Sequence, residues 1–202
     1  MFLVQILLPQ KIFKENNKMD KFAPNSVIAS VTSYEDLEYA IMSEIEYVFS
    51  LSTNILTLYD TIKRVHSKNK KIYIHTDFTE GIGKDKYALM FMKKLGVDGI
   101  VSTRSNIIKM ARELGLSTVQ RFFIVDSHSV NTTIESIKAS KPDMVEIMPG
   151  IIPKVITAIK KEIDKPLIAG GLITSRKEID EAFKAGADGV SMSNKNFWNK
   201  FN

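Results

Sequence analysis

Two similar hexapeptides decide the fold: Leu95-Gly96-Val97-Asp98-Gly99-Ile100 and Ala185-Gly186-Ala187-Asp188-Gly189-Val190. Each one follows a stretch with helical periodicity, turns at a glycine suited to the left-handed end of a helix, and continues into a short apolar run. The second hexapeptide, for example, follows the apolar stripe of Ile179, Ala182 and Phe183. The repetition indicates a helix-to-strand connection used twice, and hence two related halves of one fold.

The same alternation of helix and strand extends outward from the hexapeptides over most of the chain. Capping-box patterns at 32–35 (Thr-Ser-Tyr-Glu) and 175–178 (Ser-Arg-Lys-Glu) mark two helix starts. The runs between the helices are short and apolar, which is typical of strands buried on both faces of a parallel sheet. The predicted strands are Val27–Val31, Tyr47–Leu51, Lys71–His75, Gly99–Ser102, Thr118–Val125, Met144–Met148, Leu167–Ala169 and Gly189–Met192.

Eight strands that alternate with helices fit either a doubly wound sheet or a closed barrel. The count of eight and the matching halves favour the barrel, and no glycine fingerprint for a dinucleotide follows the first strand. We therefore predict an α/β protein, a compact single-domain (β/α)8 TIM-type barrel over residues 26–202. Residues 1–25 form a variable N-terminal lead-in.

The composition excludes several classes of protein. The 202 residues are 44% hydrophobic and 25% charged, with a net charge of +5, which permits an anionic partner such as RNA or a phosphorylated metabolite. The absence of cysteine excludes disulfide scaffolds, thiolate zinc sites and cysteine nucleophiles. The apolar opening Met1–Leu8 stops at Pro9, far short of the roughly 20 residues of a membrane span, and it lacks the flanks of a secretory signal. We expect a cytoplasmic protein without membrane contact.

Polar residues follow the last two predicted strands, where barrels often bind phosphate. Gly170 and Gly171 after the seventh strand let the backbone approach an anion closely, and Ser193 and Asn194 after the eighth offer side-chain donors. The pattern predicts a phosphate site formed by these four residues. The alternative is that the two glycines only make a tight turn and that Ser193 and Asn194 only cap a helix.

Other polar residues follow the third, fourth and sixth strands. Asp77 and Glu146 lie on opposite sides of the predicted barrel opening, where each can accept hydrogen bonds from ligand hydroxyls. For Glu146, a buried ion pair with Arg121 on the neighbouring strand is an equal alternative. Arg104 either donates to a phosphate or holds its loop through carboxylates.

The chain carries no clear signature of catalysis. The Gly81–Lys84 loop lacks the spacing of a nucleotide-binding P-loop, and His66, His75 and His128 lack the spacing of metal ligands. We expect His75 to be a core or loop-anchoring residue. No lysine lies on a strand near the opening in a position for a Schiff base. The residues predict a site for a small phosphorylated polyol, with no catalytic residues, metal or cofactor.

Several strings in order resemble the glycerol-3-phosphate-responsive antiterminator family: Asp98–Asn106, Gln120–Ser127, Glu146–Lys154, Ile168–Ile173, and Ser191–Asn194 with Trp198. The resemblance covers roughly residues 25 to 200, and the lead-in has no counterpart in it. It implies a regulator rather than an enzyme. Such proteins respond to glycerol 3-phosphate, bind the leader mRNA of glycerol-catabolism operons, and prevent the terminator hairpin from ending transcription.

Lysines near the ends of helices are candidates for RNA contact on the face opposite the ligand site, although lysine also suits helix C-termini electrostatically. They are Lys68, Lys70, Lys71, Lys93, Lys94, Lys160 and Lys161, joined in the same regions by Lys138, Lys141 and Lys184. A homodimer would enlarge the RNA-binding surface. The alternatives are a small phosphosugar enzyme of the barrel type, an isomerase or lyase, and a metabolite-binding barrel that acts through a protein partner.

Overall fold

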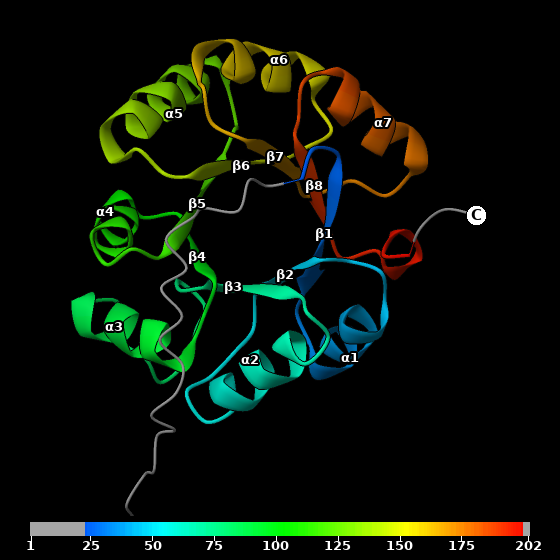
Figure 1. Ribbon diagram of the computed structural model, residues 1–202. Coiled ribbons are helices and arrows are strands. Elements are labelled where there is room, and N and C mark those ends of the chain that lie inside the picture. The colour runs from blue at the N-terminus through cyan, green and yellow to red at the C-terminus, as the bar shows by residue number, and fades with distance from the viewer. Residues whose placement is uncertain (1–22, 200–202) are drawn as a thin grey trace, which may run out of the picture.

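The computed structural model describes residues 23–199, and it confirms the predicted (β/α)8 TIM-type barrel. Eight parallel strands lie side by side in chain order and close on each other, as Figure 1 shows along the barrel axis. The strands are β1 (Ser26–Val31), β2 (Tyr47–Ser50), β3 (Lys71–His75), β4 (Gly99–Ser102), β5 (Ser117–Phe123), β6 (Met144–Met148), β7 (Leu167–Gly170) and β8 (Gly189–Met192). Most of the predicted lead-in, residues 1–22, lies outside the described residues.

Helices surround the barrel and connect successive strands (Figure 1). They are α1 (Tyr34–Met42), α2 (Leu58–His66), α3 (Lys86–Leu95), α4 (Ser105–Glu113), α5 (Ser127–Ser140), α6 (Pro153–Glu162) and α7 (Arg176–Lys184). A short 3-10 helix, η1 (Lys195–Phe197), follows β8. Within residues 23–199 no helix is long and apolar enough to cross a membrane.

The helix ends follow the capping signals in the sequence. The predicted capping box of α7 is confirmed, because Ser175 and Glu178 exchange side-chain and backbone hydrogen bonds. Asp126 caps α5 in the same way with Ser129. Gly96 ends α3 in the left-handed conformation, with φ of 90°.

The capping box predicted at 32–35 is wrong by one residue. Ser33 is the N-cap of α1, and its Oγ accepts a hydrogen bond from the amide of Asp36 at 3.1 Å. The Asp36 carboxylate in turn accepts from the amide and hydroxyl of Thr32, at 3.3 and 3.0 Å. Because the helix begins at Tyr34, Asp36 occupies the position that the prediction gave to Glu35.

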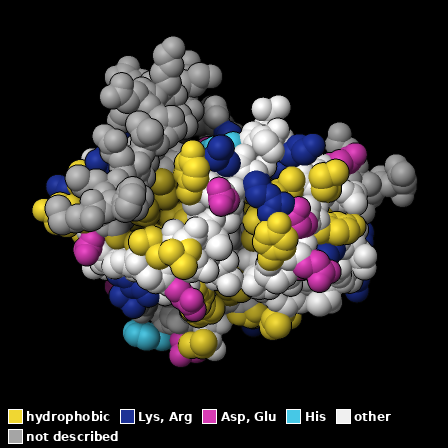
Figure 2. Space-filling model, turned by 90° about the horizontal axis from the view of Figure 1, so that it is seen from below, with side chains coloured by type: hydrophobic (Ala, Val, Ile, Leu, Met, Phe, Trp, Pro, Cys, Tyr) yellow, Lys and Arg dark blue, Asp and Glu magenta, His cyan; other side chains and the backbone are white. Residues whose placement is uncertain are grey.

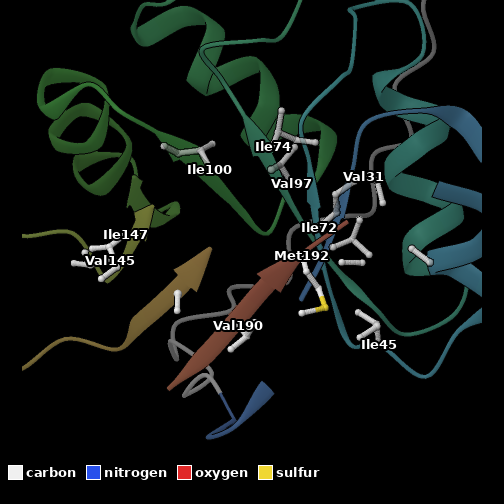
Figure 3. Packing of buried hydrophobic residues seen from close by; sticks show 14 of the residues in the cluster. Val31, Ile45, Ile72, Ile74, Val97, Ile100, Val145, Ile147, Val190 and Met192 are labelled. Carbon is white, nitrogen blue, oxygen red and sulfur yellow. The ribbon is translucent and has the colours of Figure 1, made fainter. Parts of the chain in front are cut away.

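Two separate apolar clusters form the core. The outer cluster packs one side of the strands against the helices, and Figure 3 shows members of it from β3, β4, β6 and β8. The inner cluster fills the barrel itself with alternate strand residues, as a period of two requires. It contains Ile28, Tyr47, Phe49, Tyr73, Val101, Val119, Met144 and Ile168.

The two hexapeptides make the same connection in the two halves. Asp98 Oδ2 accepts hydrogen bonds from the Ile72 amide and from His66 Nε2, both at 2.8 Å. Asp188 Oδ2 accepts from the Leu167 amide at 2.7 Å and from Lys160 Nζ at 2.6 Å. Each aspartate therefore joins the start of the preceding strand, β3 or β7, to the helix before that strand, α2 or α6, as internal half-repeats predict.

Figure 2 shows the side of the molecule that α1, α2 and α3 cover. Hydrophobic side chains are exposed there (Figure 2), and the exposed hydrophobic residues of α1 and α3 include Tyr34, Met42 and Tyr87. Lys and Arg side chains alternate on this side with Asp and Glu rather than gathering into one patch (Figure 2).

Candidate ligand-binding site

The mouth of the barrel, the end at which the eight strands finish, brings the predicted site residues together. Asp77 follows β3, Arg104 follows β4, and Glu146 lies within β6. Gly170 and Gly171 lie at the end of β7, and Ser193 and Asn194 follow β8. Because all eight strands are parallel, these residues share one end of the barrel.

A buried polar group forms the floor of the mouth. Arg121 Nε donates to Glu146 Oε2 at 2.6 Å, and Ser191 Oγ donates to Glu146 Oε1 at 2.5 Å. Arg121 and Ser191 are 4% and 2% exposed, and Glu146 is fully buried. The ion pair that was the alternative for Glu146 is therefore present. It joins β5, β6 and β8 inside the barrel.

Glycine at position 170 is required by this floor. A Cβ atom there would lie 2.5 Å from Ser191 Oγ and 2.6 Å from Glu146 Oε1, closer than non-bonded atoms approach. The carboxylate of Glu146 thus occupies space that any side chain at position 170 would fill. The glycine serves the packing of the floor as well as the turn after β7.

Asp77 ties the loop after β3 to the loop after β4. Its Oδ1 accepts from Ser102 Oγ, and its Oδ2 accepts from the amide and hydroxyl of Thr103, each at 2.8 Å. Burial acts to raise the pKa of Asp77, but these hydrogen bonds outweigh it and hold the pKa below its ordinary value. The loop residue Lys84 also donates its ammonium group to the Asp77 carbonyl.

Arg104 lies on the other side of the mouth from the glycines. Its Nε is 3.9 Å from Asp77 Oδ1, and its side chain is half exposed. Since β4 and β8 are four strands apart in a closed barrel of eight, the loop of Arg104 lies across the mouth from the loop of Ser193. Its described contact is with a carboxylate, which was the loop-holding alternative.

The loops after β7 and β8 carry backbone amides without partners. Within residues 23–199, no acceptor receives a hydrogen bond from the amides of Gly171, Leu172, Ser193 or Asn194. Gly171 and Leu172 have φ of 75° and 61°, in the left-handed region. Consecutive amides in a turn of this kind can form a concave site for an anion.

Asn194 has a structural role beside any contact with a ligand. Its Oδ1 accepts from the Asn196 amide at 3.1 Å, capping η1, and its Nδ2 donates to the Thr174 carbonyl at 3.4 Å. The helix-cap alternative is therefore present for Asn194. The second contact joins the loops that follow β7 and β8.

His75, which the sequence predicts to be a core or loop-anchoring residue, lies at the floor of the mouth. The residue is 1% exposed, and neither ring nitrogen has a hydrogen-bond partner in the described part of the chain. Burial and the positive charge of Arg121 lower the pKa of His75 to about 4, so the ring is neutral at neutral pH. The ring of Phe78 lies over the imidazole, with centroids 4.4 Å apart.

The alternation of strand residues could have identified both His75 and Arg121. Tyr73 and Val119 belong to the inner cluster. His75 and Arg121 lie two residues further along the same strands, so they point into the barrel near the mouth. A polar residue at an inward strand position near the mouth is therefore a better sequence signal for the floor of a site than a glycine in a loop.

The lysines predicted to contact RNA lie at or near helix C-termini and the starts of strands, at the end of the barrel opposite the mouth. Three of them donate within the fold. Lys70 is buried and donates to the carbonyls of Ser43 and Ile45, Lys93 donates to the Leu114 carbonyl, and Lys160 pairs with Asp188. Lys71 lies over the ring of Tyr47. Lys68, Lys94 and Lys161 are exposed.

The site offers binding groups rather than metal ligands. Among residues 23–199 no three His, Cys, Asp or Glu side chains are grouped to hold a metal ion. The described polar groups are two arginines, two carboxylates, a neutral imidazole and free backbone amides. Such a set can bind an anion at the amides and hydroxyl groups at the carboxylates.

Comparisons with known proteins agree with this fold. The chain is 36% identical over 175 residues to "Uncharacterized protein YgcP" of Escherichia coli K12, covering 86% of this chain and 92% of that protein. A crystal structure of a glycerol uptake operon antiterminator regulatory protein from Listeria monocytogenes has 32% identity and a TM-score of 0.83, and the match covers 88% of this chain and 97% of that one.

A crystal structure of a glycerol uptake operon antiterminator-related protein from Thermotoga maritima has 30% identity and a TM-score of 0.78, with 87% of this chain and 98% of that one covered. The family model described as "Glycerol-3-phosphate responsive antiterminator" matches residues 27–198, which is nearly the whole barrel. This chain therefore belongs to the glycerol-3-phosphate-responsive antiterminator family.

Proposed function

We propose that this protein is an RNA-binding transcription antiterminator that responds to glycerol 3-phosphate. It binds the leader mRNA of glycerol-catabolism operons in the cytoplasm and prevents termination. The main support for this proposal is the group of polar residues at the floor and in the loops of the barrel mouth, found in a chain of this family. The effector binds at the mouth, and RNA binds elsewhere on the surface.

The loops after β7 and β8 take the phosphate in this proposal. The unpartnered amides of Gly171 and Ser193 support it, because they present donors where barrels often bind phosphate. Gly170 and Asn194 complete the phosphate site, and Arg104 supplies a cation from across the mouth. Asp77 and Glu146 accept hydrogen bonds from the ligand hydroxyls.

We propose a binding protein rather than an enzyme. Asp77, held ionised by hydrogen bonds from Ser102 and Thr103, is a poor proton donor near neutral pH. Glu146 is ion-paired with Arg121 and accepts from Ser191, and its remaining lone pairs can accept from a ligand hydroxyl. An assay for isomerase or lyase turnover of a triose phosphate tests the enzyme alternative, and activity there would replace this proposal.

In this proposal RNA binds the exposed lysines at the end of the barrel opposite the mouth. Lys68, Lys94 and Lys161 are exposed, while Lys70 is buried and Lys160 is paired. Lysines that contact phosphates release counterions, so affinity should fall with salt. By linkage, RNA must tighten glycerol 3-phosphate binding by the same factor by which the ligand tightens RNA binding.

Thermal melting tests the effector. Glycerol 3-phosphate at 100 times its dissociation constant should stabilise the folded protein by about 2.7 kcal/mol. Glycerol and inorganic phosphate at equal concentrations are the controls, and each should give a smaller shift. If glycerol 3-phosphate raised the melting temperature no more than inorganic phosphate does, the hydroxyl groups of the ligand would not be bound, and the proposed effector site would be wrong.

RNA binding is tested with the leader RNA of the organism's own glycerol-catabolism operon, with and without glycerol 3-phosphate. Affinity should rise with the ligand and fall steeply with salt. The triple variant Lys68→Ala, Lys94→Ala, Lys161→Ala should show a flatter salt dependence while it still binds the ligand. Unchanged RNA binding in this variant would move the RNA surface elsewhere, and sedimentation of the complex would show whether a homodimer binds.

A further inference from the structure

The floor of the mouth contains one polar side chain that the fold does not use. His75 is 1% exposed, and neither Nδ1 nor Nε2 has a partner within residues 23–199. Buried polar groups in folded proteins almost always have a partner, because an unpaired one has lost its hydrogen bonds to water. Packing alone does not account for this imidazole.

The neighbouring inner positions show what packing alone would select. Val101 on β4 lies opposite His75 in the strand register, and Phe49 on β2 lies opposite Tyr73, two residues earlier on β3; both are buried and apolar. An apolar side chain at position 75 would continue this cluster without an unpaired polar atom. The imidazole therefore indicates a role at the mouth.

Phe78 is the residue that covers the imidazole. The two rings lie 4.4 Å apart at an angle of 30°, and Phe78 is 57% exposed. Phe78 belongs to the loop that follows β3, so it lies between His75 and the mouth. An exposed aromatic side chain can change rotamer without disturbing the core.

We propose that His75 is a ligand-binding residue whose imidazole exchanges hydrogen bonds with a hydroxyl group of the bound polyol phosphate, with the Phe78 ring turned aside. This inference rests on the proposed function, because it needs a polyol phosphate in the mouth. It adds a residue to the predicted hydroxyl contacts of Asp77 and Glu146.

The chemistry of the ring selects a hydroxyl rather than a phosphate. A neutral imidazole has one donor and one acceptor nitrogen, which matches a hydroxyl group that both donates and accepts. Burial and the nearby Arg121 hold the pKa of His75 at about 4, so at neutral pH the ring carries no positive charge to attract an anion. The contact should therefore be insensitive to pH between about 6 and 8.

Paired ligands test the proposal in solution. Calorimetry would compare glycerol 3-phosphate with propyl phosphate, which has the phosphate but no free hydroxyl. In His75→Phe, affinity for glycerol 3-phosphate should fall about tenfold, as for the loss of a neutral hydrogen bond, and affinity for propyl phosphate should not change. His75→Gln, which keeps a donor and an acceptor, should recover part of the loss.

The outcomes separate this inference from the proposed function. If both ligands lose affinity equally in His75→Phe, or neither does, His75 does not read a hydroxyl. If the unaltered protein binds neither ligand, the proposed function fails, and this inference fails with it.

Nitrogen-15 NMR of the unaltered protein gives a test that needs no variant to fold. The chain has three histidines, His66, His75 and His128, so the imidazole signals are few. Glycerol 3-phosphate should shift the ring nitrogens of His75, and propyl phosphate should not. Equal shifts from the two ligands, or none, would overturn the proposal.

Discussion

The β3–β4 pair and the β7–β8 pair are built alike at one end and differently at the other. In both pairs the register is the same, with Tyr73 opposite Gly99 and Ile168 opposite Gly189. At the amino-terminal ends, Asp98 and Asp188 accept hydrogen bonds from the first buried amide of the preceding strand. This end of each half serves stability.

The mouth is where the halves differ. Counted along the common register, His75 corresponds to Gly170, and Val101 corresponds to Ser191. One half places an imidazole at the floor, while the other leaves a space that the Glu146 carboxylate fills. A few inward positions near the strand ends therefore turn a repeated scaffold into a site.

The largest predicted effect comes from breaking the ion pair at the floor. Arg121→Leu leaves Glu146 charged and buried with only Ser191 as a partner, so we expect a loss of about 3–5 kcal/mol in unfolding free energy. Urea denaturation measures it. The matched control is Arg121→Leu with Glu146→Leu, which removes both charges and should recover most of the loss. A double variant as unstable as the single one would contradict this explanation.

The next largest expected effect is the loss of stability when a side chain is added at position 170. Gly170→Ala forces the Cβ against Ser191 and Glu146, and we expect a loss of up to about 3 kcal/mol by overpacking. Adding Ser191→Gly should return part of that stability, because it removes one of the two clashing atoms. Urea denaturation of Gly170→Ala, Ser191→Gly and the double variant gives the coupling free energy between the two positions. Additive effects would show that the clash is relieved elsewhere.

The sequence predicts the amino-terminal ends better than the mouth. The repeated hexapeptides predicted the related halves, and the capping residues and apolar runs predicted the eight strands, because these signals are local. In the structure β5 is Ser117–Phe123, so it begins one residue earlier and ends two residues earlier than the predicted strand Thr118–Val125. Such shifts reflect pairing with neighbouring strands, which no local signal contains.

The floor could not be assembled from local signals. Arg121, Glu146 and Ser191 come from three strands, and only closure of the barrel brings Ser191 to Glu146. The sequence offered Arg121 as a partner of Glu146 but could not decide between that pair and a ligand. His75 was expected to be a core or loop-anchoring residue, and it is buried, but its missing partners are a property of the folded structure.

A third prediction tests whether the two aspartates contribute equally. Asp98→Ala and Asp188→Ala each remove the acceptor of a strand amide and of an outer side chain, so each should cost about 1–2 kcal/mol. Thermal or urea unfolding of both variants at pH 6 measures the costs. Losses that differ by more than the measurement error would show that the shared geometry does not imply shared energetics.

The smallest expected effect is a pH dependence of stability that arises at Asp98, whose partner is a histidine, and not at Asp188, whose partner is a lysine. The hydrogen bond that His66 donates to the Asp98 carboxylate raises the pKa of His66 above its ordinary value near 6.5, against an opposing effect of burial. A raised pKa in the folded state stabilises the protein fully below about pH 6.5, and this contribution is lost as the pH rises through the raised value. Because His66 is partly exposed, the change should stay below about 1 kcal/mol. In His66→Lys, which copies Lys160, the decline in unfolding free energy between pH 6 and 9 should be smaller than in the unaltered protein. An identical decline in both proteins would assign the pH dependence to other groups.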